Sequence, residues 1–492
     1  MMFRERPCRS IRSKSVLGIV CAIATLAPFV PAASAGTLLE DLGKLFTPSQ
    51  PAQDAPAVSA HLHGAPLPSA PTAPSEKDFR KIYSGWLDQA IMAHYPAETD
   101  PQGAAYLRAA LAYLGEGDPS PTLLAQERSF DLQKTDEPAL LLFIGVIEPP
   151  SLRRLDALKK ATQNISSSSY PRFIWFMAAA NAGKAAADSK ANQSELKVCD
   201  ELSLKYLAEA LADDSFLPSE MAALRWRFNA NSTQDLFYRN FDRVAEIFNA
   251  SPKVDPWLKE YVNGLRYVRA AWKARGTGWS NTVTENGWHD FGDNLASARQ
   301  HLTKSCELNP HDPAAAADMI TVCMGENEEK GTMRSWFDRA VAADFDYIPA
   351  YKNFLWGLRP RWLGNAAEMT AFGRECAATG RYDTWVPYEF VIAALDISDD
   401  STDHSALFAD TKLDDELLAV LNNYFLQPKP LIPVNYAHSV AAIIAHKAGY
   451  ADEMKRQLAA TNYKPVTGRV LRQLDDLNDL VKQVQPQPSP TP

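Results

Sequence analysis

Apolar residues recur every three or four positions along most of the chain, a spacing that places them on one side of an α-helix. Trp257, Tyr261, Leu265, Val268 and Trp272 form one such stripe. Alternating runs of β-branched residues, which would indicate strands, do not occur in the sequence. The periodic runs are about 10–20 residues long and end at short breaks rich in Pro, Gly, Asn and Asp. The pattern therefore predicts an all-α protein.

The helices are too numerous for one simple bundle. Roughly 400 residues of helix with short connections pack economically as stacked hairpins, because each hairpin buries its apolar face against the next. We therefore expect an α-solenoid of stacked antiparallel helical hairpins. Residues 116–119 (EGDP) and 309–313 (NPHDP) are expected breaks. Residues 138–149 (PALLLFIGVIEP) are predicted to form a buried helix, since about ten apolar residues are too few to span a membrane.

The first 35 residues have the pattern of a secretory signal peptide. Five basic residues lie within 4–14, the apolar run Val16–Val30 follows, and Ala33-Ser34-Ala35 has the small residues of a cleavage site. The apolar run of about 15 residues is short for a membrane span, so an uncleaved anchor is the weaker alternative. We predict cleavage after Ala35, export to the bacterial periplasm or the exterior, and no transmembrane segment in the mature chain.

Charge narrows the range of partners. The chain carries 50 Lys+Arg and 59 Asp+Glu, a formal net charge of −9. Loss of residues 1–35 removes five basic residues and one acidic residue and leaves a net charge of about −13. Such an acidic protein disfavours nucleic acid and anionic lipid, which a basic surface would bind. We therefore predict no nucleic-acid partner.

Four cysteines remain after the predicted cleavage removes Cys8 and Cys21. No C-x-x-C pair is present, so the sequence suggests neither a zinc site nor thioredoxin-type redox chemistry. One or two disulfides in an oxidising compartment and a set of buried free thiols are both open. The four positions are Cys199, Cys306, Cys323 and Cys376.

Two neighbouring segments carry similar spacings of small and large residues. In the first, Ala298, Leu302, Ser305 and Pro310 lie four, three and five positions apart. About 35 residues later the spacing recurs, and a weaker copy follows with Phe372 and Arg374. The second segment consists of Met333, Phe337, Ala340 and Phe345, followed by Tyr351 and Phe354.

Residues 292–358 therefore resemble tetratricopeptide repeats, in which small residues let two helices approach and a large residue fills the gap. The resemblance implies a helical-repeat fold. Two features depart from the family: Phe345 replaces the closing proline, and the Trp-Leu-Gly-Tyr pattern of the first helix is mostly lost. The family's binding residues are for this reason not transferred.

A second resemblance covers about 255–400. The stretch Lys273–Phe291 (KARGTGWSNTVTENGWHDF) is followed by Met319–Val322, by Trp336–Ala340, and by Pro360-Arg361-Trp362 with Gly364. This order is similar to an uncharacterised bacterial family, the domain of unknown function numbered four thousand and thirty-four. The resemblance implies an all-helical repeat domain and no known activity.

Composition then divides the chain into segments. Residues 47–76 contain seven prolines, seven alanines and no aromatic residue, so they cannot bury a core. The expected order is a signal peptide (1–35), a short helical segment (36–46), a disordered Pro/Ala-rich linker (47–77), an N-terminal helical region (78–254), a tetratricopeptide-like repeat domain (255–400), C-terminal helices (401–484) and a disordered Pro-rich tail (485–492).

The most unusual loop is Arg275-Gly276-Thr277-Gly278-Trp279. Its two glycines permit close approach of a ligand, and Arg275 can anchor an anion. Trp279, Trp288 and His289 are the residues expected to form a platform for a peptide or a sugar. The alternative is a long connection folded back on the helices with its tryptophans buried.

A second candidate is the loop Arg359-Pro360-Arg361-Trp362. Two guanidinium groups beside an indole can grip a carboxylate tail or an acidic peptide. The alternative is an exposed turn between helices. Eight of the eleven tryptophans lie within 257–385, which suggests sugar stacking, although helical repeats also use large aromatic residues as core.

Motifs for metal binding and catalysis do not emerge. The acidic run Asp396–His404 resembles a calcium loop, but its sixth position is Ser401 rather than Gly and its twelfth is Leu407 rather than Glu. Nucleophile elbow, zinc-protease, Walker and dinucleotide motifs are all lacking. We expect no metal and no cofactor, and we favour a non-enzymatic role, while an active site assembled from distant residues stays open.

These observations favour an exported helical-repeat protein that acts as a protein–protein interaction module, either an adaptor or an assembly factor of the bacterial envelope. A protein partner is expected because stacked hairpins form curved surfaces that bind protein segments. The first alternative is a carbohydrate-binding or glycan-active helical protein, whose ligand is a glycan. The second is a structural solenoid without a ligand.

Overall fold

The computed structural model describes residues 76–116, 121–188, 193–212, 236–278, 280–401, 406–428, 431–466 and 477–484. Several predicted segments lie outside these ranges: the signal peptide, the segment 36–46, most of the linker, Trp279 and the tail 485–492. Every regular element within them is an α-helix or a short 3₁₀ helix, and no strand occurs there. The all-α prediction is therefore confirmed for the described chain. None of the described helices is long and apolar enough to cross a bilayer.

The first group of helices begins with α2 and includes the predicted apolar helix. Residues 138–147 do form it, with Pro138 in the first turn and the Glu137 side chain accepting the N–H of Leu140 at 2.8 Å. Nearly all of its residues are buried, as the sequence predicts. The group comprises α2 (Glu76–Met92), α3 (Pro101–Glu116), α4 (Pro121–Arg128), α5 (Pro138–Ile147), α6 (Leu152–Ile165), α7 (Arg172–Asp188) and α8 (Gln193–Ala212).

The central group contains the two segments that resemble tetratricopeptide repeats and both candidate loops. The predicted break at 309–313 separates two of its helices. The group comprises α11 (Phe241–Ala250), α12 (Pro256–Arg275), η3 (Ser280–Thr282), α13 (Glu285–Leu308), α14 (Ala314–Gly325), α15 (Lys330–Ala343), α16 (Ile348–Gly357), α17 (Ala366–Ala378), η4 (Val386–Tyr388) and α18 (Glu389–Asp400).

The last group forms the C-terminal end of the described chain. It comprises η5 (Ala406–Ala409), α19 (Thr411–Phe425), α20 (Val434–Lys447), α21 (Ala451–Ala460) and α23 (Leu477–Val484).

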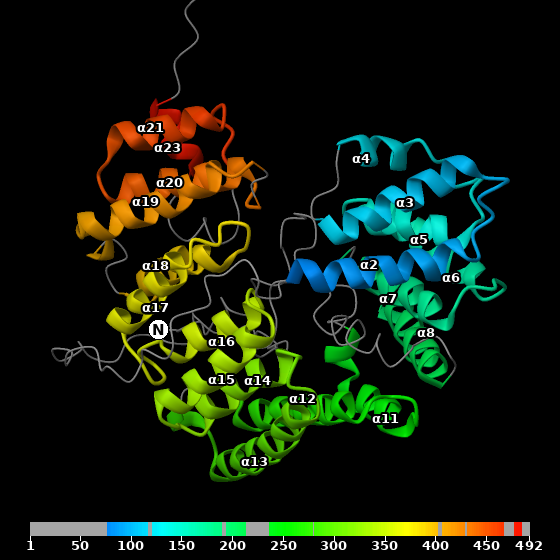
Figure 1. Ribbon diagram of the computed structural model, residues 1–492, viewed down its shortest axis with the longest axis horizontal. Coiled ribbons are helices and arrows are strands. Elements are labelled where there is room, and N and C mark those ends of the chain that lie inside the picture. Colours follow the sequence, from blue (N-terminus) through cyan, green and yellow to red (C-terminus); the bar gives the residue numbers. More distant parts are fainter. Residues whose placement is uncertain are drawn as a thin grey trace, which may run out of the picture.

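Helices pack mainly against their neighbours in the sequence. The contact between α12 and α13 is the most extensive, and α7 with α8 and α5 with α6 follow. In the central group, α12 also contacts α14, α14 contacts α16, and α16 contacts α18. The described helices follow an open curve in Figure 1, from α2–α8 through α11–α13 to α14–α18 and then α19–α21, with α13 on the outside of α12.

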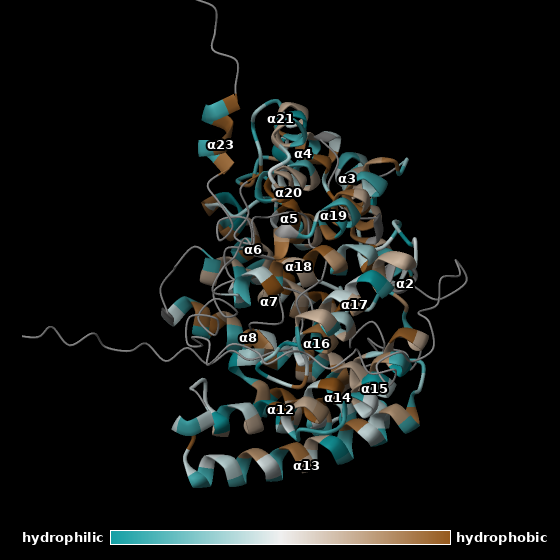
Figure 2. Ribbon diagram, turned by 90° about the vertical axis from the view of Figure 1, so that its left-hand side faces the viewer, coloured by the Kyte–Doolittle hydropathy of each residue, from teal (hydrophilic) through white to brown (hydrophobic). Residues whose placement is uncertain are grey.

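Small residues set the close contact between α12 and α13. A Cβ atom at Gly264 would lie 2.6 Å from the Leu302 side chain, so only glycine permits this separation. The Ser305 hydroxyl donates a hydrogen bond to the carbonyl of Trp257 at 2.9 Å. Leu302 and Ser305 are buried in α13, on the side that the spacing of the sequence indicates. Brown and teal residues alternate along α13 in Figure 2, as expected for a helix that is buried on one side.

The second segment with this spacing is centred on Phe337 of α15. Its ring is fully buried and lies 5.1 Å from that of Tyr351, 5.0 Å from Phe354 and 5.3 Å from Phe372, measured between ring centroids. Phe337 therefore joins α15 to α16 and α17. The edge-to-face geometry of two of these pairs is favourable for aromatic rings.

Buried side chains form two apolar clusters in the described chain. One extends from Tyr83 in α2 to Ile397 in α18 and crosses the predicted boundary at 254 without a break. The other extends from Tyr388 in η4 to Val481 in α23. Helix α18 contributes to both clusters, so it connects the C-terminal helices to the rest of the protein.

Replacement of Phe337 by Ala should destabilise the protein strongly, because it removes the ring that three helices share. We expect the free energy of unfolding to fall by about 3–5 kcal/mol, measured by urea denaturation. The matched control is Ser335→Ala at an exposed position of the same helix, where a change of about 0.5 kcal/mol or less is expected. Equal effects of the two substitutions would contradict the central position of Phe337.

All four cysteines of the predicted mature chain are free and buried. Of the two alternatives left open by the sequence, the structure shows the free thiols. Burial raises the pKa of Cys199 to about 11, and those of Cys306 and Cys323 to about 12. Thiols that are buried and protonated react slowly with alkylating and disulfide reagents.

A thiol titration tests this assignment. The native protein should react with almost no Ellman's reagent. The unfolded protein should release four equivalents of thionitrobenzoate, one for each cysteine, without prior reduction. Two further equivalents, from Cys8 and Cys21, would show that the predicted signal peptide is retained. Fewer than four equivalents before reduction, rising to four after it, would instead demonstrate a disulfide.

Candidate functional site

The connection between α12 and α13 is shorter than the sequence suggests. Helix α12 ends at Arg275 and is followed by Gly276, whose φ of +74° is unfavourable for other residues. Helix α13 begins at Glu285, where the Thr284 hydroxyl accepts the N–H of Gly287 at 3.0 Å. Trp288 therefore lies in the first turns of α13, and its expected place in a long loop is wrong. The N-cap formed by Thr284 is the physical reason.

The two candidate loops meet in space. The Arg275 guanidinium lies 5.7 Å from the ring centre of Trp272, 5.6 Å from that of Trp288 and 5.6 Å from that of Trp362. The Trp272 and Trp362 rings are themselves 5.6 Å apart in edge-to-face geometry. We call these four residues the Trp–Arg cluster. Cation–π attraction operates at such distances, so the cluster joins the end of α12, the start of α13 and the loop after α16.

Exposure differs within the Trp–Arg cluster. Trp272 retains 4% of its surface, whereas Trp288 retains 41% and is the one exposed tryptophan among those described. Arg275 and Trp362 are half-buried. The cluster is thus anchored in the core on one side and open to solvent at Trp288.

Burial lowers the pKa of Arg275, and no charged neighbour offsets this effect. Its guanidinium donates to the carbonyls of Gly276 and Gly278 at 3.3 and 3.4 Å. Within the described ranges, no carboxylate forms an ion pair with it. Arg275 is therefore a partly desolvated cation that lies among three tryptophan rings.

Arg359 and Arg361, by contrast, form ion pairs with helix α18. Arg359 is 6% exposed and lies 2.6 Å from Asp400 and 3.7 Å from Asp396, while Arg361 lies 3.5 Å from Asp400. Both guanidinium groups also lie over the ring of Trp356, at 4.7 and 4.5 Å. Burial, with the like charge of Arg359, lowers the pKa of Arg361 to about 10. These arginines fix the 359–362 loop to α18, and the expected exposed turn is not what forms.

The other candidate residues lie elsewhere or outside the described chain. His289 is exposed, and its Nδ1 atom lies 3.3 Å from Asp293 one turn later in α13. Trp279 is outside the described ranges. The acidic run that resembles a calcium loop is helical up to Asp400, so its side chains do not alternate around one point. No group of side chains suited to holding a metal ion occurs among the described residues.

Sequence reasoning placed Trp272 in the core stripe of α12 and did not connect it with Arg275. The spacing Trp272–Arg275, three residues within a helix, was an available signal, because such residues lie on one face. Trp356 and Arg359 repeat that spacing at the end of α16. Nothing in a single sequence indicates that the two loops meet.

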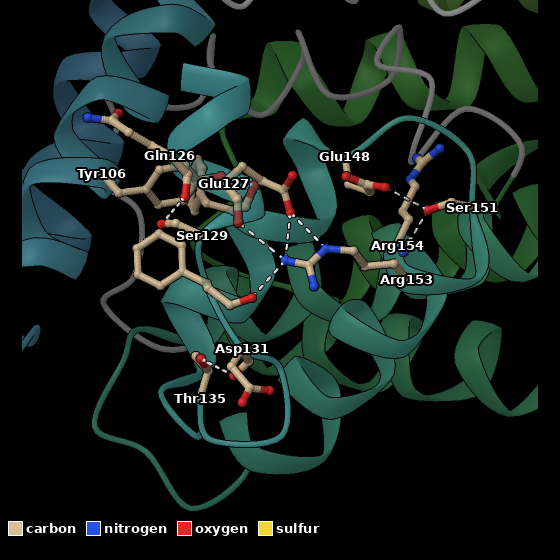
Figure 3. A network of polar contacts seen from close by, with 12 residues as sticks. Tyr106, Gln126, Glu127, Ser129, Asp131, Thr135, Glu148, Ser151, Arg153 and Arg154 are labelled. Carbon is tan, nitrogen blue, oxygen red and sulfur yellow. Dashed lines mark hydrogen bonds and ion pairs between the residues drawn. The ribbon is translucent and has the colours of Figure 1, made fainter. Parts of the chain in front are cut away.

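Sequence reasoning also missed a buried charged group in the N-terminal helices. Glu127 of α4 is completely buried and accepts hydrogen bonds from the Nε and Nη2 atoms of Arg153 at 3.2 and 3.1 Å. Arg153 also donates to the Phe130 carbonyl at 3.0 Å. Figure 3 shows this guanidinium group held against Glu127, while the hydroxyl of Ser151 donates to Glu148 at 3.0 Å. Arg153 thus fastens the start of α6 to the end of α4.

Glu127 and Glu148 form a carboxyl pair. One oxygen of each, Oε2, is buried and lacks a hydrogen-bond donor among the described residues. Burial and the adjacent carboxyl group of Glu148 together raise the pKa of Glu127 to about 7, against the opposite effect of Arg153. Near neutral pH Glu127 is therefore partly protonated, because burial beside another carboxyl group disfavours its charged form. Glu127 itself is fully buried and is bonded to Arg153, so we interpret it as a structural group that links α4 to α6.

No protein-family model matches the chain, and no match is found among curated proteins. The resemblances to tetratricopeptide repeats and to the uncharacterised bacterial family therefore rest only on the residues quoted above, and they stay predictions. The fold and the site define a class: an all-helical protein of sequentially packed helices with a Trp–Arg cluster at the end of α12.

The carboxyl pair predicts how stability depends on pH. Since the folded pKa of Glu127 is raised from its ordinary value of 4.5 to about 7, its contribution is fully present below pH 4.5 and is lost as pH rises through 7. Glu127→Gln should remove this loss, so the free energy of unfolding should depend less on pH between 4.5 and 7. Denaturant unfolding at several pH values measures it.

The matched control for this experiment is Glu98→Gln, which replaces an exposed glutamate in the same helical region. It should retain the pH dependence of the unsubstituted protein. A Glu127→Gln variant that follows the same pH curve would show that this carboxyl group does not titrate in the folded state as described.

Proposed function

We propose that this protein is an exported helical-repeat protein of the bacterial envelope, and that its folded part is a protein–protein interaction module. It would act as an adaptor or an assembly factor. Export is supported by the basic, apolar and small-residue order of residues 1–35. An interaction role is supported by the open curve of helices, since extended curved surfaces of this kind bind protein segments.

A stacked arrangement of hairpins accounts for the contacts of the central helices. Alternate helices α12, α14, α16 and α18 touch one another, while each also packs against a neighbour in the sequence. That pattern is what stacking of two-helix units produces. Leu302, which packs against Gly264, and Phe337 lie at the spacings that resemble tetratricopeptide repeats. We therefore propose a tetratricopeptide-like solenoid for about 255–400.

The single observation that carries the interaction role is the Trp–Arg cluster. Its residues come from positions up to 90 apart, and they bring a cation that has no carboxylate partner in the described ranges beside an exposed indole. Tryptophan and arginine are enriched among residues that contribute most to protein interfaces, because they combine a large apolar area with polar groups. Arg275 and Trp288 are therefore the proposed centre of the binding surface, with Trp362 as support. Arg359 and Arg361 position the supporting loop.

The glycan alternative has weaker support. Stacking on sugars requires several exposed tryptophans along one surface, whereas Trp257 and Trp272 are buried and Trp288 alone is exposed among the described tryptophans. A structural solenoid without a ligand would leave the partly desolvated charge of Arg275 without a purpose. These two points support the proposal of a protein partner over the two alternatives.

Site-specific photocrosslinking in the protein's own cells tests the proposal. A benzoylphenylalanine at position 288 should yield a discrete crosslinked protein, because Trp288 lies at the open side of the cluster. The matched control is the same group at position 152, where Leu152 is 75% exposed at the start of α6, and it should yield no such product. Arg275→Gln should reduce the crosslink at 288 severalfold without changing the urea midpoint of unfolding.

Identical products from positions 288 and 152 would show adventitious contact and contradict the proposed surface. A crosslink that survives Arg275→Gln unchanged would contradict the central role of the cluster. Glycan fragments in place of protein at position 288 would favour the carbohydrate alternative.

A further inference from the structure

The Trp–Arg cluster contains hydrogen-bond donors that lack acceptors. The indole Nε1 atoms of Trp272 and Trp362 are both buried, and neither has a hydrogen-bond partner among the described residues. A buried indole N–H usually finds an acceptor, because leaving it unpaired costs the full desolvation of the group. The rings that carry these two donors are 5.6 Å apart, and both lie beside Arg275, so an acceptor bound at this place would find several donors close together.

Arg275 adds a group with few acceptors among the described residues. The guanidinium has five N–H donors, and the hydrogen bonds that the described residues accept are the two long ones to Gly276 and Gly278. Compare Arg334, which is more deeply buried and donates to Glu375 at 2.9 and 2.6 Å and to Asp338 at 2.7 Å. The protein thus neutralises a buried arginine with carboxylates elsewhere, but in the described chain it supplies none to Arg275.

We propose that the Trp–Arg cluster is a binding site for a carboxylate. The carboxylate would accept hydrogen bonds from Arg275 and from a buried indole N–H, and its neighbouring apolar group would pack on the exposed face of Trp288. A single uncompensated cation matches the single charge and planar shape of a carboxylate better than the double charge of a phosphate. This inference rests on the proposed function and assigns the chemistry that the partner must present.

Two sources carry this chemistry: an acidic residue or chain terminus of a protein, and an acidic sugar. The protein's net charge of −9 makes general attraction of acids unfavourable, so recognition must be local. Within the cluster, the positive charge of Arg275 provides that local attraction. A peptide carboxylate is the source that agrees with the proposed function.

The test uses the full chain labelled with 5-fluorotryptophan and followed by fluorine NMR. The resonances of Trp272 and Trp362 are assigned from the Trp272→Phe and Trp362→Phe variants. Benzoate is the probe, because it joins a carboxylate to a flat apolar ring, and benzamide is its neutral counterpart. Benzoate should shift both resonances to saturation, whereas benzamide should not.

Arg275→Gln should weaken benzoate binding by at least about tenfold, since hydrogen bonds to charged groups contribute that much. The matched control is Arg339→Gln, which alters an arginine lying 5.1 Å from the ring of Trp336 outside the cluster. It should leave benzoate binding unchanged. Arg275→Lys keeps the charge but not the planar fork, and it serves as a second variant if Arg275→Gln fails to fold.

Three outcomes would overturn the inference: benzamide binding as tightly as benzoate, phosphate binding as tightly as benzoate, or benzoate binding that survives Arg275→Gln. Absence of saturable shifts would overturn it as well. A carboxylate site that prefers N-acetylglutamate to glucuronate supports both the inference and the proposed function. Preference for glucuronate supports the carboxylate site but contradicts a protein partner. A protein crosslink at position 288 without benzoate binding supports the protein partner but contradicts the carboxylate site.

Discussion

The close contact between α12 and α13 is the constraint on which the site depends. Because Gly264 has no side chain, the two helices can approach closely. The Ser305 hydroxyl of α13 donates to the carbonyl of Trp257 in the first turn of α12. The connection from the end of α12 to the start of α13 must then turn tightly, which Gly276 permits through its positive φ. Trp272, Arg275 and Trp288 are brought together as a result of this packing.

Charged groups are buried in two different ways in this protein. Arg153, Arg334 and Arg359 each meet a carboxylate within 3.2 Å, and they link one helix to another. Such pairs are costly to break, because one partner would remain as an uncompensated buried charge. Arg275 is held by aromatic rings and carbonyls instead. A fixed cation that meets few acceptors within the described residues is suited to recognition, whereas the paired arginines are suited to support.

The helical fold could be read from the sequence because it depends on local periodicity. The stripe on α12, the buried helix at 138–147 and the break at 309–313 all follow from the spacing of apolar residues and helix-ending residues. The site could be predicted only in part. Arg275, Trp288 and Trp362 were found as unusual residues, but their meeting depends on packing between distant helices. The buried pair of Glu127 and Glu148 was missed for the same reason.

Asp400 has a consequence for the cooperativity of the protein. It holds both arginines of the loop that carries Trp362, and it ends α18, the helix that belongs to both apolar clusters. Unfolding of the C-terminal helices would remove the support on one side of α18 and so loosen the loop under the Trp–Arg cluster. The cluster is therefore mechanically coupled to the C-terminal helices through α18.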